Sequence, residues 1–298
     1  KKKKILVFAK KEKYKNLTAY IAVNNFLRKH KLYTPKTLLN NVKQGIIIIE
    51  DFGNTSFHKI LLGQKNKFKI YKKLIHLLIK IQKIKPKANI KSINGKSHKI
   101  NKYTKNYLIK ESNLFFEWYL PLIFKKKKIF KIKKKLKVEL LKLYKKLYFP
   151  NKYFIHRDFH VENLMKVKKK IGLIDSQDAL IGNPAYDLVS LIDDVRIKTS
   201  SKLKDKIYNY YLKKNSKVIG NNKIYFKNDF EILSILRNLK IIGIFSRLYK
   251  RDKKEKYLKL IPYTWSLIEK RLKSKKFIQI KKIFDEYIPK NSRKKILY

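Results

Sequence analysis

Three side chains near the middle of the chain have the types and the spacing that phosphoryl transfer needs. Asp158 and Asn163 are five residues apart in one polar segment, and Asp175 follows Asp158 by 17 residues. A carboxylate can orient an acceptor hydroxyl and take its proton, while an amide oxygen and a second carboxylate can ligate Mg²⁺. The predicted chemistry is therefore the transfer of a phosphoryl group to a hydroxyl.

These side chains can meet only if the chain between them doubles back. The stretch between Asn163 and Asp175 has room for two short strands and contains Gly172. A hairpin of that length would return Asp175 to the side of Asn163. We therefore expect residues 153–175 to form two short strands around a polar loop that carries Asp158.

The composition around these residues departs from that of the whole chain. The 298 residues include 77 Lys and Arg against 21 Asp and Glu, which gives a formal net charge of +56. Yet residues 171–197 contain no Lys, and seven carboxylates lie between residues 158 and 194. An acidic, Lys-free segment in a basic chain indicates a divalent-cation site. Asp193 and Asp194, near its end, are expected to be a solvated helix end.

The rest of the composition limits which other functions this protein can have. The lysines are spread along nearly the whole chain, and Ile, Asn, Tyr and Phe are also abundant, which indicates A/T-rich coding more than a polyanion-binding face. The absence of Cys excludes disulfides and thiolate chemistry. No apolar run approaches the roughly 18 residues of a membrane helix. We expect a cytoplasmic protein without a specific nucleic-acid or membrane partner.

The spacing of apolar residues predicts a small α/β part followed by a mainly helical part. Strands are expected at residues 5–9 and 46–49, and helices over 16–30, 65–84, 110–119, 125–148 and from 186 onward. The fold class is therefore α+β. We expect an N-terminal, nucleotide-binding lobe at residues 1–53 and a helical C-terminal lobe, with the catalytic loop and the substrate site, at residues 54–298.

The motifs resemble those of the aminoglycoside/choline kinase-like phosphotransferases, which are relatives of the protein kinases. The resemblance rests on the pattern HxDxxxxN at residues 156–163 and on IDxxD at residues 174–178. GIIIIEDFGNTSF (45–57), NLFFEWYL (113–120) and LKIIGIFSRLYKRDKKEKYLKLIP (239–262) resemble one branch, the anomeric N-acetylmuramate/N-acetylglucosamine kinases of cell-wall recycling. The resemblance implies a two-lobed, protein-kinase-like fold and runs over nearly the whole chain.

The resemblance also implies a role for each residue of the central segment. Asp158 is expected to be the catalytic base, and Asn163 and Asp175 are expected to hold Mg²⁺. His156 and Asp187 are expected to be structural, His156 tying the catalytic loop to the metal-binding turn and Asp187 supporting that loop from the next helix. His156 and His160 could suggest zinc, but no third ligand has suitable spacing.

On the nucleotide side, Glu50 and Asp51 are expected to follow the strand whose backbone binds the adenine of ATP. Lys10 is a candidate contact for the phosphates. In the family, a phosphate-covering loop and its strands precede the first strand, whereas this chain begins at Lys1 and its first Gly is Gly45. We therefore expect an N-terminally shortened lobe. Ser176 stands where many of these kinases have an aromatic residue, which leaves the packing of the metal-binding turn open.

Four residues are candidates for binding the acceptor: Asp178, Arg237, Arg247 and Trp118. On a helix predicted over 232–252, one arc carries the basic side chains Arg237, Lys240, Arg247 and Arg251. These can contact an anionic group of the acceptor or form internal ion pairs, and both interpretations stay open. For Trp118, stacking on a sugar and packing in the core are the two alternatives.

We therefore predict an ATP- and Mg²⁺-dependent small-molecule kinase that acts as a monomer. The predicted acceptor is the anomeric hydroxyl of N-acetylmuramate or N-acetylglucosamine. The alternative within the same family is another hydroxyl acceptor, such as an aminoglycoside or a choline-like amine. The alternative from a different class is a non-catalytic protein that binds polyanions through its positive charge.

Overall fold

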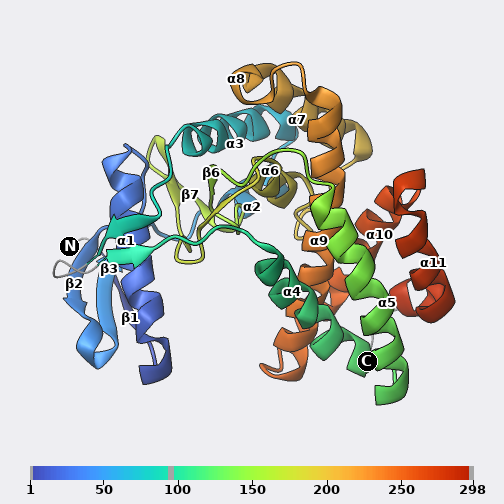
Figure 1. Cartoon of the computed structure of the whole chain (residues 1–298). Coiled ribbons are helices and arrows are strands. Elements are labelled where there is room, and N and C mark those ends of the chain that lie inside the picture. The colour runs from blue at the N-terminus through green and yellow to red at the C-terminus, as the bar shows by residue number, and fades with distance from the viewer. Residues whose placement is uncertain (1–2, 93–96, 295–298) are drawn as a thin grey trace. The chain divides into compact units, whose positions relative to one another are not determined.

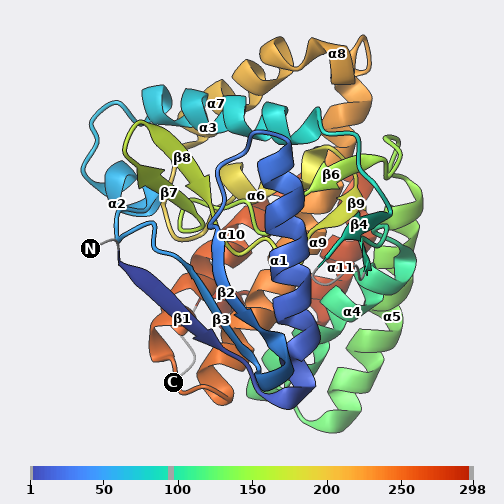
Figure 2. The ribbon, with the colours of Figure 1, turned by 90° about the vertical axis from the view of Figure 1, so that its left-hand side faces the viewer.

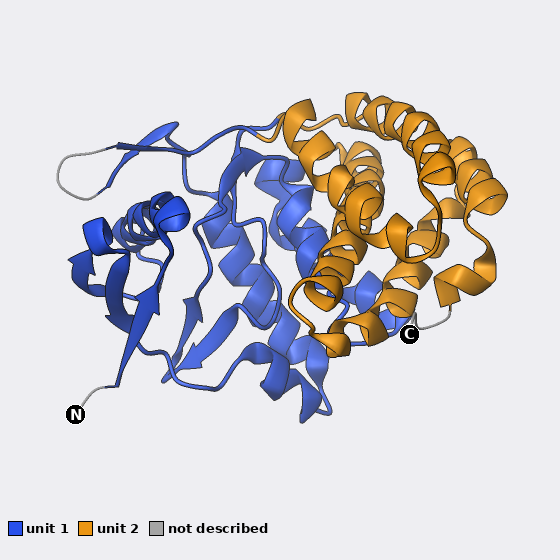
Figure 3. Cartoon of the chain, turned by 90° about the horizontal axis from the view of Figure 1, so that it is seen from below, with its two compact units in different colours: residues 1–102, 151–219 blue, residues 103–150, 220–298 orange. Residues whose placement is uncertain are grey.

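The computed structural model describes residues 3–92 and 97–294 (Figure 1). Contacts divide the chain into two compact units, which are residues 1–102 with 151–219 and residues 103–150 with 220–298 (Figure 3). Each unit is thus built from two separate segments of the sequence. This division does not follow the expected boundary after residue 53, and the assignment of a nucleotide lobe and a substrate lobe stays a prediction.

The first unit contains a three-stranded antiparallel sheet beside one helix (Figure 2). The strands lie in the order β1 (Lys4–Phe8), β3 (Ile46–Glu50), β2 (Thr37–Asn41). Helix α1 (Tyr14–Lys29) buries Leu17 and Ile21 in one cluster with Ile47 and Ile49 of the central strand. Every second residue of β3 is buried, as expected for a strand with one face on a core.

Two short antiparallel pairs carry the central polar segment. β6 (Tyr153–Ile155) pairs with β9 (Leu180–Gly182), and β7 (Leu164–Val167) pairs with β8 (Lys170–Leu173). The predicted count of two strands over residues 153–175 is therefore wrong, because three strands lie there and the first pairs with a strand beyond that range. The β7–β8 hairpin nevertheless returns the chain from Asn163 to Asp175 as expected, since Leu164 lies opposite Leu173.

Helices and one further hairpin complete the first unit. They are α2 (Phe57–Leu62), α3 (Lys67–Gln82), β4 (Asn89–Lys91), β5 (Ser97–Lys99), α6 (Ala185–Ile192), α7 (Ser201–Lys214) and α8 (Ser216–Ile219). Side chains of Ser56, Asn66 and Ser200 cap the first turns of α2, α3 and α7 by accepting backbone N–H bonds. Buried Gln82 accepts hydrogen bonds from Tyr211 and Asn215, and thereby ties α3 to the end of α7.

The second unit is helical in the residues that the structure describes. It contains α4 (Lys105–Leu114), the π-helical turn η4 (Phe115–Tyr119), α5 (Lys126–Lys145), α9 (Lys223–Lys250), α10 (Ile261–Leu272), α11 (Ile278–Tyr287) and α12 (Lys290–Lys294). Short 3₁₀ turns in the two units are η1 (Lys11–Lys13), η2 (Val42–Gln44), η5 (Leu120–Leu122), η6 (Glu255–Leu260) and η7 (Lys275–Phe277). Within the described ranges, none of the helices has the length and the apolar character to cross a bilayer.

Candidate active site

The loop between β6 and β7 carries Asp158, and a buried carboxylate fixes its start. Asp187, in the first turn of α6, is fully buried and accepts hydrogen bonds from the backbone N–H groups of His156 at 2.6 Å and Arg157 at 2.8 Å. Arg157 has a φ of 76°, a left-handed conformation that is unfavourable for a residue with a side chain. The two hydrogen bonds offset this cost and fix the backbone immediately before Asp158.

A tight turn brings Asn163 back beside Asp158. The Nδ2 of Asn163 donates to the backbone carbonyl of Asp158 at 3.1 Å, and the backbone N–H of His160 donates to the same carbonyl at 2.9 Å. Because the amide nitrogen of Asn163 is engaged in this way, its Oδ1 is the atom that can face a cation. Asp158 itself is half-buried.

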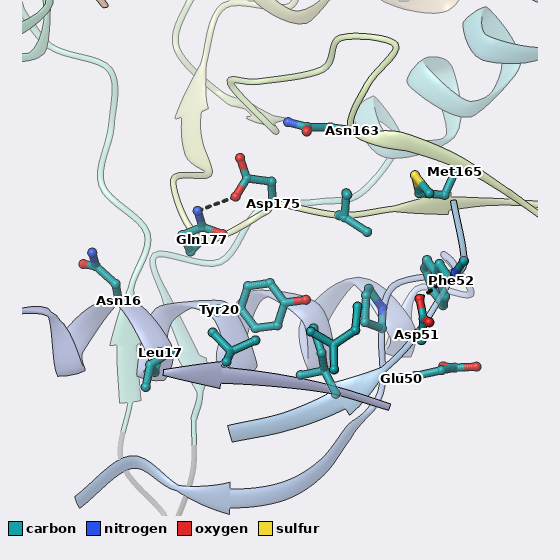
Figure 4. Close-up of a pocket in the computed structure, with 16 residues that line it drawn as sticks. Asn16, Leu17, Tyr20, Glu50, Asp51, Phe52, Asn163, Met165, Asp175 and Gln177 are labelled. Carbon is teal, nitrogen blue, oxygen red and sulfur yellow. Dashed lines mark hydrogen bonds between the residues drawn. The ribbon is translucent and has the colours of Figure 1, made fainter. Parts of the chain in front are cut away.

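The β7–β8 hairpin places Asp175 at the same cavity as Asn163 (Figure 4). The backbone N–H of Ile174 donates to the carbonyl of Asn163 at 3.1 Å, which holds the two ends of the hairpin together. Asp175 is exposed and has a φ of 63°, and Gln177 Nε2 donates to its Oδ1 at 2.7 Å. The strained backbone at Asp175 is the kind of outlier that concentrates at functional sites.

The cavity shared by Asn163 and Asp175 has a volume of about 410 Å³. Apolar side chains form much of its lining: Ile5, Val7, Leu17, Ile49, Met165 and Ile174. Residues Glu50, Asp51, Phe52 and Gly53, which follow the central strand of the sheet, line it as well. A mostly apolar cavity with a few polar groups in its lining suits a purine base.

The carboxylates of Glu50 and Asp51 already have partners within the protein. Glu50 accepts hydrogen bonds from the Tyr33 hydroxyl at 3.0 Å and from the backbone N–H of Lys36 at 3.3 Å. Asp51 accepts one from the backbone N–H of Gly53 at 2.7 Å, which closes a turn. These bonds shape the segment after β3, while an adenine contact through its backbone stays a prediction.

Asp158, the predicted base, and two further predicted site residues of the first unit, Lys10 and Asp178, lie outside the cavity lining. Lys10 is exposed after the end of β1. Asp178 is exposed and lies 3.6 Å from Nη1 of Arg157. The phosphate contact of Lys10 and the acceptor contact of Asp178 therefore stay predictions.

In the second unit, internal ion pairing accounts for two of the four basic residues on the predicted arc. Lys240 is buried and its Nζ lies 3.4 Å from Glu111, while Arg251 is exposed and pairs with Asp252 at 2.7 Å. Arg237 differs from both. It is only 2% exposed, and no hydrogen-bond partner for its three guanidinium nitrogens is found among the described residues.

Arg247 and Trp118, the other two acceptor candidates of this unit, are both half-buried. Burial lowers the pKa of Arg247, and the positive charge of Arg251 lowers it further. Trp118 lies in the π-helical turn η4, a type of distortion that often occurs at functional sites. Anion binding by the two arginines and sugar stacking by Trp118 stay predictions.

His156, the first residue after β6, is fully buried. Burial lowers the pKa of His156, although Asp158, Asp175 and the backbone at Ile174 act in the opposite direction. Neither ring nitrogen of His156 has a hydrogen-bond partner within the described residues. The contact of the ring with the Ile174 backbone is therefore not a well-formed hydrogen bond. A neutral, buried ring agrees with a structural role better than with proton transfer.

The oxygen atoms at the cavity suit Mg²⁺. Within residues 3–92 and 97–294, no group of three or more His, Cys, Asp or Glu side chains could hold a metal. Mg²⁺ needs no such group, because it commonly binds one or two protein oxygens and takes water and phosphate oxygens for the rest. Asn163 and Asp175, which line one cavity, would hold the ion, and it would neutralise phosphate charge there.

The turn that carries Asp175 is tied to α1 by a contact that the sequence did not reveal. The Ser176 hydroxyl donates to Oδ1 of Asn24 at 2.6 Å, and both residues are fully buried. One turn earlier on α1, burial raises the pKa of Tyr20 to about 12, although a hydrogen bond with Asn24 acts against it. Ser176 departs from the aromatic residue that the resemblance implies at this position, but nothing in the sequence indicates Asn24 as its partner.

The expectation that Asp193 and Asp194 form a solvated helix end is wrong. They are 0% and 2% exposed. Asp193 pairs with the buried Lys204 at 2.9 Å, and Asp194 accepts a hydrogen bond from the backbone N–H of Val161 at 3.1 Å. Both carboxylates are buried because they satisfy buried donors, which apolar side chains at these positions would leave unpaired.

Comparison with known proteins identifies the class. Residues 2–218 match the model of the phosphotransferase enzyme family APH, so the chain belongs to this family and is a phosphotransferase. It is 29% identical to the N-acetylmuramate/N-acetylglucosamine kinase of Neisseria meningitidis serogroup B over 249 residues, which cover 81% of this chain and 72% of that protein. It is 24% identical to the protein of the same name from Caulobacter vibrioides over 292 residues, covering 93% and 76%.

Solved structures confirm the expected α+β, protein-kinase-like fold class. The chain resembles the AMP-bound spectinomycin phosphotransferase APH(9)-Ia with a TM-score of 0.62 at 14% identity, covering 92% of this chain and 88% of that one. It resembles choline kinase LicA from Streptococcus pneumoniae with a TM-score of 0.58 at 15% identity, covering 91% and 85%. At these identities the likeness concerns the fold alone.

Proposed function

We propose that this phosphotransferase is an ATP- and Mg²⁺-dependent kinase of N-acetylmuramate and N-acetylglucosamine, acting on the anomeric hydroxyl. The observation that carries the proposal is the geometry of the loop and hairpin. Asn163 is hydrogen-bonded to the backbone of Asp158 and lines one cavity with Asp175. Asp158 does not line the cavity itself, but it lies in the same loop as Asn163, so a base and two cation ligands come from one loop and its hairpin, as phosphoryl transfer requires.

In this proposal each residue has one task. The apolar part of the cavity binds the adenine of ATP, and Asn163 and Asp175 hold the ion that neutralises the phosphates. Asp158 orients the acceptor hydroxyl and takes its proton as the new O–P bond forms and the bond to ADP breaks. Asp187 keeps the loop in place through the two backbone N–H groups that it binds.

The choice of acceptor rests on the names of the relatives. The relatives from Neisseria and Caulobacter both bear the name of an N-acetylmuramate/N-acetylglucosamine kinase, and their matches cover most of this chain.

An acceptor panel tests the proposal. The protein is incubated with ATP, Mg²⁺ and, in turn, N-acetylmuramate, N-acetylglucosamine, an aminoglycoside and choline, and ADP release is measured. We expect turnover with the two amino sugars, an anomeric phosphate in the ³¹P spectrum of the product, and loss of turnover with EDTA. Turnover with only the aminoglycoside or choline would transfer the proposal to that acceptor, and turnover with none would refute it.

A pair of variants tests the assigned base. Asp158→Asn should lower kcat by about 10²- to 10⁴-fold while the affinity for ATP stays within a factor of about three. Asp205→Asn, an equally conservative change at an exposed position on α7, should leave both quantities unchanged. Equal turnover in the two variants would remove Asp158 from the mechanism.

A further inference from the structure

The catalytic loop is held by a second buried carboxylate, beyond Asp187. Asp194 follows α6, is 2% exposed, and its Oδ2 accepts a hydrogen bond from the backbone N–H of Val161 at 3.1 Å. Val161 is fully buried and lies in the loop between Asp158 and Asn163. Asp187 thus binds the backbone just before Asp158, and Asp194 binds it after Asp158.

Arg196 closes a ring of contacts between Asp194 and the loop. The Oδ1 of Asp194 accepts hydrogen bonds from the backbone N–H of Arg196 at 3.1 Å and from its Nη1 at 3.2 Å. The Nε of the same guanidinium forms an ion pair with Glu162 at 2.8 Å, without the alignment of a hydrogen bond. Because Glu162 directly follows Val161, two adjacent loop residues are bound by the Asp194–Arg196 pair.

Asp194 keeps its charge at this buried position. Burial alone would raise the pKa of Asp194, but the charge of Arg196, the nearby His160 and the backbone N–H groups of Arg196 and Val161 outweigh it, so the pKa is lowered. A charged acceptor binds an amide more strongly than a neutral one does. The backbone at Val161 is therefore held by a stronger bond than a neutral side chain would provide.

We propose that Asp194 and Arg196 are positioning residues that fix the separation between Asp158 and Asn163. The proposal rests on the proposed function, in which these two residues are the base and a cation ligand. If the loop shifts at Val161, either the base or the amide oxygen leaves its working position while the nucleotide cavity keeps its other walls. A misplacement of about 1 Å in such a site can cost about 10²-fold in rate.

The neighbouring Asp193 provides a matched control. It is as deeply buried as Asp194 and also pairs with a cation, but that cation is Lys204 of α7, and the 2.9 Å bond joins the end of α6 to another helix. Asp193→Asn therefore disturbs a buried ion pair of the same kind. It leaves the Asp194–Val161 bond in place.

The experiment compares Asp194→Ala, Asp194→Asn and Asp193→Asn with the wild-type chain, at a temperature where all of them remain folded by circular dichroism. We expect Asp194→Ala to lower kcat about 10- to 100-fold, with KM for ATP changed less than about threefold. Asp194→Asn keeps an acceptor oxygen but loses the charge, so its kcat should lie between those of Asp194→Ala and the wild type. Asp193→Asn should keep wild-type kcat even where its thermal stability falls.

Hydrogen exchange of the ligand-free protein gives a readout that does not depend on activity. The backbone amide of Val161 should exchange faster in Asp194→Ala than in the wild type, and Asp193→Asn should show wild-type exchange there. Unchanged exchange in Asp194→Ala, or an equal loss of kcat in Asp193→Asn, would overturn the proposal. A wild-type chain without kinase activity would refute the proposed function instead, and the exchange at Val161 would still decide whether Asp194 holds the loop.

Discussion

Replacing Gly172 with Ala should disturb the wall of the predicted nucleotide cavity. Gly172 lies in β8, and a Cβ atom there would come within 2.5 Å of Cδ2 and 2.6 Å of Cε2 of the Phe52 ring. To restore an ordinary contact of 3.4 Å, the ring must retreat by about 0.9 Å. Phe52 lines the cavity, is 7% exposed and stacks on Tyr33 with ring centroids 4.8 Å apart, so it has little room to move.

The expected cost follows from overpacking. Forcing one extra methyl group into a filled site typically costs about 1–3 kcal/mol, and here the displaced ring belongs to a stacked, buried pair. We therefore expect Gly172→Ala to lower the free energy of unfolding in urea by about 1–3 kcal/mol. Because the same ring lines the cavity, we also expect calorimetry to show weaker binding of ATP than in the wild type.

Gly63→Ala is the matched control for Gly172→Ala. Gly63 has a φ of −89°, and the nearest atom to a Cβ placed there is the Ile60 carbonyl oxygen at 4.0 Å. This variant should be neutral or more stable by about 0.4–1 kcal/mol, since Ala loses less backbone entropy on folding. If Gly172→Ala unfolds at the same urea concentration as the wild type and binds ATP equally well, a Cβ at position 172 does not displace the Phe52 ring, and the reasoning is refuted.

Two further experiments test contacts outside the loop that carries Asp158. Combining Ser176→Ala with Asn24→Ala should give a double-mutant coupling of about 1 kcal/mol in urea unfolding, because the two buried side chains share one 2.6 Å hydrogen bond; strictly additive effects would contradict this. Gly243→Ala should lower the thermal midpoint of unfolding markedly, since its Cβ would lie 2.6 Å from the Leu114 carbonyl oxygen in the backbone that leads into η4. An unchanged midpoint would show that α9 can move away from that backbone at little cost.

The sequence was sufficient for the parts of the site that depend on local spacing. The five-residue interval from Asp158 to Asn163 fits a tight turn, and the twelve residues from Asn163 to Asp175 fit a hairpin, so both could be derived from chain geometry. The α+β class followed from short, continuous apolar runs at residues 5–9 and 46–49 and from an apolar period near 3.6 in the later segments. Such patterns can be recognised in a single sequence because residues close together along the chain produce them.

Contacts between distant segments could not be predicted in this way. The pairing of β6 with β9 joins residues on opposite sides of the catalytic loop and hairpin, and the Ser176–Asn24 bond links positions 152 residues apart. Such pairs leave no periodic trace in the sequence. Such pairs form between the buried donors and acceptors that still lack a hydrogen bond once the local helices and strands have packed together.

The Lys-free segment shows how burial and chemistry can be confused in a biased composition. Residues 179–195 are buried without interruption, and a Lys there would need a buried partner for its charge. Burial alone therefore removes Lys from most of this segment. Of the seven carboxylates from 158 to 194, only Asp175 is among the residues lining the cavity, whereas Asp187, Asp193 and Asp194 bind backbone amides or Lys204. In a lysine-rich chain, a segment without Lys therefore indicates burial, with its carboxylates bound to buried donors, before it indicates a ligand site. Which carboxylate faces a ligand has to be inferred from the spacing of residues within the motif.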